Sequence, residues 1–175
     1  MNDLEWFETY LPNTIDTVLS LRELNLEFIP DTLWERIPNV SVLDLSFNAL
    51  TSIPSTLGLC TNLQELWLNN NGLTLLPTTL SNLELTRLDV SYNSLSSLTN
   101  INSVIIDASQ NDISEVDGLS VNTCILNLAD NNLSDVPDSV CDLPNLQVLN
   151  ICNNEIVNIP SITARFNHRL SEFWY

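Results

Sequence analysis

The sequence predicts an α/β repeat solenoid: a horseshoe with a parallel β-sheet on its concave face and helical caps at its N- and C-terminal ends. Three regularities lead to this prediction. An asparagine recurs at nearly constant intervals, aliphatic and polar residues alternate just before each asparagine, and a proline often follows at a fixed distance. Self-similarity at a period of roughly 20 to 50 residues is typical of chains in which each repeat adds one structural unit to a stack.

The asparagine positions define the repeat. Successive members are separated by 23, 22, 18, 20 and 23 residues. They are Asn48, Asn71, Asn93, Asn111, Asn131 and Asn154. Aliphatic residues lie two and five positions after each one, and the shared pattern is LxxLxLxxNxLxxLP. An earlier copy, VLSLRELNLEFIP at residues 18–30, matches VLDLSFNALTSIP at residues 42–54 with Leu24 in the asparagine position, which gives seven repeats.

Each part of this pattern has a physical role. In LxLxxN the alternating leucines point inward from a short strand, and the strands of neighbouring repeats pair in parallel. The asparagine amide both donates and accepts, so it can satisfy backbone groups where the chain bends away from the strand. One repeat cannot bury its own leucines, and stacking therefore supplies the core.

The pattern LxxLxLxxNxLxxLP, which extends over residues 18–160, resembles the leucine-rich repeat family of the intracellular type. The resemblance implies the horseshoe fold and, as a generic role, non-catalytic binding of a protein partner on the concave face. The chain also looks like the small leucine-rich repeat effectors of intracellular bacterial pathogens, which implies an inhibitor or adaptor of an enzyme. The alternative is a cytosolic signalling scaffold similar to the Ras-pathway repeat proteins.

We expect a single domain over residues 1–175. Residues 1–17 are expected to form an N-terminal helical cap, because their apolar side chains have helical spacing. The seven repeats occupy residues 18–160, and residues 161–175 are expected to form a C-terminal cap that is also helical. The fourth and fifth repeats have return segments too short for much helix.

The composition narrows the classes of partner. The formal net charge is −17, and the chain has five basic residues, none of them lysine. Nucleic acid and anionic membranes are therefore excluded as partners, and the charge favours one protein partner with a basic surface or cleft. The four cysteines match neither zinc nor disulfide spacing, and no cofactor is expected.

The location is predicted from what the sequence lacks. No apolar run reaches the length of a membrane span, and the N-terminus has no pattern of a secretory signal. We therefore expect a cytoplasmic protein that is monomeric on its own. If the protein is a bacterial effector, we expect secretion into the host cytosol without a cleaved signal peptide.

The concave face carries the candidate binding site. The strand residue between the two leucines and the residue just before the asparagine are expected to face the concavity, which places Phe47, Trp67 and Tyr92 on successive repeats. An aromatic cluster with a charged rim predicts a binding hot spot. A flanking column with valines and isoleucines at its ends either extends this patch or packs under a neighbouring loop. The predicted partner-binding residues are Asp44, Phe47, Glu65, Trp67, Asn69, Arg87, Asp89, Tyr92, Asp107, Asn127, Asp130 and Asn150.

Catalytic motifs are absent from the sequence. The remote alternative is a thiol enzyme in which Cys152 and His168 form a nucleophile pair, although no third group is predicted to orient either of them. The acidic column of Asp44, Asp89 and Asp107 could hold calcium, but Trp67 interrupts it, and a solvated acidic face toward a basic partner is favoured.

Overall fold

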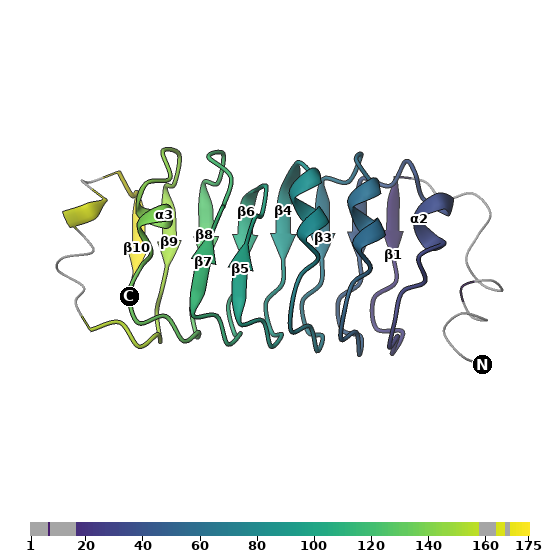
Figure 1. Ribbon diagram of the computed structural model, residues 1–175, viewed down its shortest axis with the longest axis horizontal. Helices are drawn as coiled ribbons and strands as arrows, with labels where there is room; N and C mark the ends of the chain where they lie inside the picture. Colours follow the sequence, from purple (N-terminus) through teal and green to yellow (C-terminus); the bar gives the residue numbers. More distant parts are fainter. Residues whose placement is uncertain (1–6, 8–16, 158–163, 167–168) are drawn as a thin grey trace.

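Short runs of alternating apolar and polar residues form the strands, because one side of each run is buried and the other faces outward. In the computed structural model, residues 7, 17–157, 164–166 and 169–175 are described. Eight strands form one parallel sheet in the order β1-β2-β3-β4-β6-β8-β9-β10, side by side along the long axis of the molecule (Figure 1). They are β1 (Val18–Ser20), β2 (Val42–Asp44), β3 (Glu65–Trp67), β4 (Leu85–Asp89), β6 (Ser103–Asp107), β8 (Ile125–Asn127), β9 (Val148–Asn150) and β10 (Glu172–Trp174).

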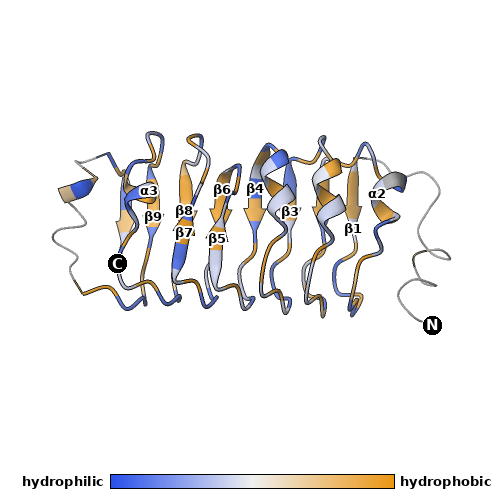
Figure 2. Cartoon of the chain, in the orientation of Figure 1, coloured by the Kyte–Doolittle hydropathy of each residue, from blue (hydrophilic) through white to orange (hydrophobic). Residues whose placement is uncertain are grey.

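The core lies behind this sheet, and its first layer is a column of aliphatic side chains. One residue of each strand from β1 to β9 points inward in register with its neighbours, and these side chains are at most 7% exposed. They are Leu19, Leu43, Leu66, Leu88, Ile106, Leu126 and Leu149. The strands accordingly carry hydrophobic (orange) segments in Figure 2, and stacking supplies the core that a single repeat lacks.

The return segments form a second layer on the convex side. It consists of α2 (Leu33–Arg36), η1 (Ser55–Leu59), η2 (Thr78–Asn82), β5 (Ser97–Thr99), β7 (Glu115–Asp117) and α3 (Asp138–Cys141). Within it, α2 contacts η1, η1 contacts η2, β5 pairs with β7, and α3 contacts β7. The fourth and fifth repeats, which were expected to have little helix, contribute the two strands of this layer.

The recurring asparagines form a ladder just beyond the ends of the strands. Asn111 Nδ2 donates to the carbonyl oxygen of Ala108 in its own repeat (3.2 Å) and to that of Val90 in the preceding repeat (3.0 Å). Its Oδ1 accepts a hydrogen bond from the N–H of Leu95, also in the preceding repeat (2.9 Å). The same three bonds recur at Asn48, Asn71, Asn93, Asn131 and Asn154. Each amide therefore joins the bend of one repeat to the backbone of the previous repeat.

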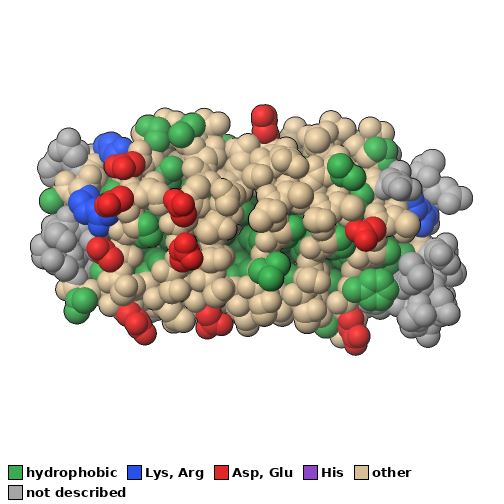
Figure 3. Space-filling view, in the orientation of Figure 1, with side chains coloured by type: hydrophobic (Ala, Val, Ile, Leu, Met, Phe, Trp, Pro, Cys, Tyr) green, Lys and Arg blue, Asp and Glu red, His purple; other side chains and the backbone are tan. Residues whose placement is uncertain are grey.

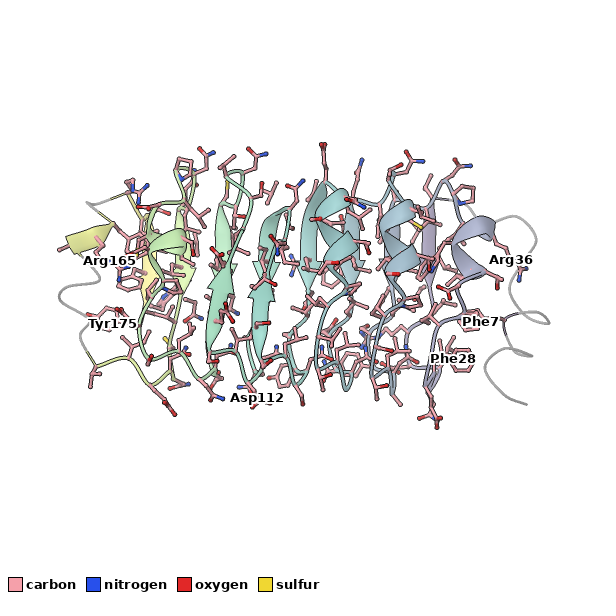
Figure 4. The ribbon with its side chains drawn as sticks, viewed as in Figure 1. Phe7, Phe28, Arg36, Asp112, Arg165 and Tyr175 are labelled. Carbon is pink, nitrogen blue, oxygen red and sulfur yellow. The ribbon has the colours of Figure 1, made fainter. Side chains whose placement is uncertain are left out.

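The C-terminal end differs from the helical cap that was expected. Residues Glu172–Trp174 form β10, which pairs in parallel with β9 and extends the sheet, so the prediction of a helix was wrong for this part. Only residues 164–165 are helical among the described residues of 161–175. Phe166 is buried, and its ring centroid lies 6.0 Å from that of Phe173. Aromatic packing thus closes this end, where Figure 4 labels Arg165 and Tyr175.

The N-terminal cap lies almost entirely outside the described residues. Phe7 is helical and buried in the hydrophobic core, and its carbonyl oxygen accepts a hydrogen bond from Arg36 (2.9 Å), near Phe28 in the view of Figure 4. The rest of the predicted helix falls on residues 1–6 and 8–16, which are not described. No helix in the described part of the chain has the length and apolar character needed to cross a membrane.

Replacing Asn111 with alanine is expected to lower the free energy of unfolding by about 3 kcal/mol or more, because several backbone groups lose their partner in a buried place. Equilibrium denaturation measures this loss. The control is Asn145→Ala, since Asn145 is exposed and donates one bond, to the Val121 carbonyl oxygen (2.8 Å). If the two substitutions were equally costly, the ladder would not have the structural role assigned here.

Replacing Gly58 with alanine is expected to destabilise the chain by about 1–3 kcal/mol through overpacking between η1 and η2. A Cβ at Gly58 would lie 2.6 Å from both the Cβ and the carbonyl oxygen of Thr79. Gly72→Ala is the matched control, because the nearest atom to its Cβ would be the Leu50 carbonyl oxygen at an ordinary 3.5 Å. Thermal denaturation should show a lower Tm for the Gly58 variant alone, and a normal Tm for it would refute the close contact.

Candidate functional site

The strands present two outward columns of side chains on the concave face. The column at the last strand position runs Ser20, Asp44, Trp67, Asp89, Asp107, Asn127, Asn150 and Trp174. The column two residues earlier runs Val18, Val42, Glu65, Arg87, Ile105, Ile125, Val148 and Glu172. Parallel strands lie about 4.8 Å apart, so neighbours in a column touch or nearly touch.

Two arginines cover two of the predicted anchor aromatics. The Arg87 guanidinium carbon lies 4.5 Å from the centroid of the Trp67 ring, and that of Arg22 lies 4.0 Å from the centroid of the Phe47 ring. Such cation–π contacts stabilise by about 0.5–2 kcal/mol, depending on desolvation. Trp67 is therefore half-buried within its own chain, under the guanidinium of the neighbouring strand.

The three predicted aromatics do not form one cluster. Trp67 belongs to the column at the last strand position, whereas Phe47 and Tyr92 lie beyond the ends of β2 and β4 with φ of 56° and 54°. Among the described residues, no ring–ring contact joins any two of them, and Phe47 and Tyr92 remain exposed. The expected aromatic patch is thus divided between the sheet and its rim.

The predicted acidic residues are hydrogen-bonded to the backbone that follows them. Asp89 Oδ1 accepts from the N–H (3.1 Å) and the hydroxyl (2.7 Å) of Ser91. Asp44 with Ser46 and Asp107 with Ser109 repeat this arrangement. One oxygen of each carboxylate therefore holds the strand end, and only the other is available to a partner.

The remaining predicted residues lie along the same face and its rim. Glu65 and Asn69 are half-buried on the β3 repeat, as are Asn127 and Asn150 in the column at the last strand position. Asn127 Nδ2 donates to Asp107 Oδ1 (3.1 Å). Asp130 lies beyond β8, where its Oδ1 accepts from Asn153 Nδ2 (2.9 Å).

A hollow of about 310 Å³ lies on the concave face between β4 and β10. Its floor is aliphatic, and it is lined by Arg87, Ile105, Ile106, Asp107, Ile125, Leu126, Asn127, Val148, Asn150 and Trp174. Ile125 is 36% exposed and Trp174 is 45% exposed, so apolar side chains of this region face outward. The structure therefore brings together the C-terminal half of the predicted site, and not the aromatic half.

Six residues of the hollow were missing from the predicted site, and two of them, Ile106 and Leu126, are the buried inward residues of β6 and β8. Ile105, Ile125 and Val148 belong to the flanking column, and their apolar character was the signal that could have found them. Trp174 could be added only once β10 was known to extend the sheet. These three residues of the flanking column therefore line the hollow instead of packing under a loop.

The nucleophile pair of the thiol-enzyme alternative lies only partly within the described residues. Cys152 is half-buried, and its N–H donates to Asn150 Oδ1 (3.1 Å). His168 lies outside the described residues, so its distance to the thiol is not defined. Among the described residues, no three histidine, cysteine or acidic side chains gather as metal ligands would.

Burial dominates the electrostatics of Asp89. Desolvation raises the pKa of this carboxyl, the hydrogen bonds from Ser91 lower it, and the nearby charges of Asp107 and Arg87 raise and lower it respectively. Figure 3 shows the convex side, which has acidic side chains (red) along much of its length and basic ones (blue) only near the two ends. The surface field is therefore mainly negative.

Asp89→Asn is expected to gain stability relative to the wild type as pH rises. The raised pKa means that the native state keeps this proton to higher pH than the unfolded chain, so wild-type stability falls as pH increases above the ordinary value of 3.8. Asparagine does not titrate, yet it can still accept from Ser91. Denaturation at several pH values measures the difference, with Asp44→Asn as a half-buried control that keeps the same bonds to Ser46. A difference that grew as pH fell would contradict the assignment.

Two sequence models of known families match the chain. The one described as Leucine Rich repeats (2 copies) matches residues 38–84, and the one described as Leucine Rich Repeat matches residues 145–166. No curated protein sequence matches the chain.

Solved structures are similar over most of the chain. The crystal structure of the APL1 leucine-rich repeat domain has a TM-score of 0.74 and 31% identity, over 86% of this chain and 40% of that one. The LRIM1/APL1C complex gives 0.75 and 31%, over 90% and 29%. The plant peptide hormone receptor RGFR1 in complex with RGF2 gives 0.71 and 24%, over 90% and 27%, which shows the fold alone. The chain spans less than half the length of each of these proteins.

Three findings have one explanation. The sequence repeats, the strands of the repeats stack in parallel, and leucine-rich repeat family models and solved structures match the chain. The chain belongs to the leucine-rich repeat family.

Proposed function

We propose that this chain recognises one protein partner through the concave face of its sheet, and that the hollow between β4 and β10 receives part of that partner. The observation that carries the proposal is a hollow with an aliphatic floor that is open on the concave face. Exposed apolar side chains gathered in a hollow and surrounded by polar groups are typical of binding surfaces. The similar LRIM1/APL1C structure is that of a protein complex, which supports the same class of function.

The charge supports a narrower form of the proposal. The partner presents a basic surface, because 22 acidic residues outnumber five basic ones and attract such a surface at long range. Binding of this kind suits an inhibitor or adaptor that covers a basic cleft. The alternative of a signalling scaffold would use the same face, and the two differ only in what binding does to the partner.

Ile125→Asp is expected to weaken partner binding at least tenfold, because a carboxylate in the aliphatic floor must lose its water when the partner binds. Ile125 is already 36% exposed, so the fold should tolerate the change. Binders are first selected against the wild-type chain from a library of displayed protein domains, and their affinities for each variant are then measured by interferometry.

The control variant is Val157→Asp, which makes the same kind of change at a residue that is 93% exposed and outside the hollow. Selected binders should keep their affinity for it. Binders that lose affinity for neither variant, or for both alike, would place recognition elsewhere on the molecule and refute the proposal.

A further inference from the structure

One row of side chains on the concave face carries opposite charges at its two ends. In register, Arg87, Ile105, Ile125, Val148 and Glu172 lie on β4, β6, β8, β9 and β10. A guanidinium thus stands at one end of three aliphatic side chains and a carboxylate at the other. The four strand spacings between the two ends amount to about 19 Å, at roughly 4.8 Å each.

The Arg87 end has donor capacity that the described part of the chain does not use. Its guanidinium stacks on Trp67, which lies on the opposite side of β4 from the hollow, and its Nε is buried without an acceptor. Although Glu65 faces it in register, the described residues form no ion pair with Arg87. A carboxylate is the group that the planar guanidinium fork binds best, and the Arg87 guanidinium forms no hydrogen bond or ion pair with the described part of the chain.

The opposite end of the row, at Glu172, can attract a cation. Glu172 is exposed on β10, and its carboxylate has no partner among the described residues. Trp174 lies two residues further on the same strand face, lines the hollow and is 45% exposed. A carboxylate beside an open indole ring attracts a lysine or arginine through charge and through a cation–π contact.

The middle of the row suits an extended backbone with apolar side chains. The hollow, at about 310 Å³, is at the small end of ligand pockets, so it admits side chains but not a folded domain. Along its polar side, Asp107 Oδ2 can accept from a main-chain N–H, and Asn150 Nδ2 can donate to a main-chain carbonyl.

We infer that the hollow takes an extended peptide segment of the protein partner that crosses the strands, with an acidic side chain at Arg87, aliphatic side chains over the floor and a basic side chain at Glu172 and Trp174. About six residues in extended form cover about 19 Å, at roughly 3.3 Å per residue. The inference rests on the proposed function and adds the charge order of the bound segment.

The test uses pools of terminally blocked peptides, each about six residues long. Central positions are randomised among aliphatic residues and serine, and the end residues are Glu and Lys in either order, Glu at both ends, or Lys at both ends. The wild-type chain should bind one of the mixed-charge pools best. Arg87→Glu should shift the preference to the Lys–Lys pool, and Glu172→Arg should shift it to the Glu–Glu pool, by about tenfold or more each.

The controls are Arg22→Glu and Glu155→Arg, which make the same changes of charge at exposed residues outside the hollow. Arg22, like Arg87, stacks on an aromatic ring. They should leave the order of preference unchanged. A wild-type preference for the Lys–Lys pool would overturn the inference in favour of a purely basic segment. If no pool binds while selected domains still lose affinity for Ile125→Asp, the inference fails and the proposed function stands; if neither peptides nor domains depend on the hollow, both fail.

Discussion

The structure depends on the asparagine that follows each strand of the large sheet from β2 to β9. Its amide donates to the end of its own strand and to the previous repeat, and it accepts from the previous repeat's return segment. A strand of three residues cannot hold its register through backbone bonds alone, because few such bonds exist per strand. The ladder fixes each bend against the next, so that every inward leucine meets its neighbour and every outward residue falls into a column. The concave face is a consequence of that repetition.

The same requirement limits what the concave acids can do. Asp44, Asp89 and Asp107 each accept a hydrogen bond through one oxygen from the serine two positions later. These bonds give the polar groups at the strand end a partner. Their charge remains and contributes to the negative field, but their geometry is set by the fold. The recognition proposed above therefore depends more on the aliphatic floor and on the charged groups at its two ends, which form no ion pair within the described residues.

The parallel sheet and the asparagine ladder could be predicted because the same residue types recur at the same positions of successive repeats. The end of the sheet could not. In residues 170–175, Leu170, Phe173 and Tyr175 occupy the spacing of LxxLxL, but the aromatic residues and the missing asparagine hid the strand. The contact of Arg87 with Trp67 could not be predicted either. Strand register identifies the neighbours of a residue but not the direction of its side chain, and register alone would pair Arg87 with Glu65. The hollow depends on both features, and so it was only half predicted.

The pairing of β5 with β7 on the convex side has a mechanical consequence. Where two strands pair, the convex layer advances by about 4.8 Å per repeat, which is the advance of the concave sheet itself. A stack of units bends only when one side advances further than the other, as it does where packed helices, about 8–10 Å apart, oppose a sheet. The fourth and fifth repeats are therefore expected to stack more nearly straight than the second and third, whose return segments η1 and η2 are helical. The paired strands β5 and β7 lie behind β4 and β6. The Arg87 end of the aliphatic row is therefore expected to be flat, so that the row does not curve around a bound peptide segment there.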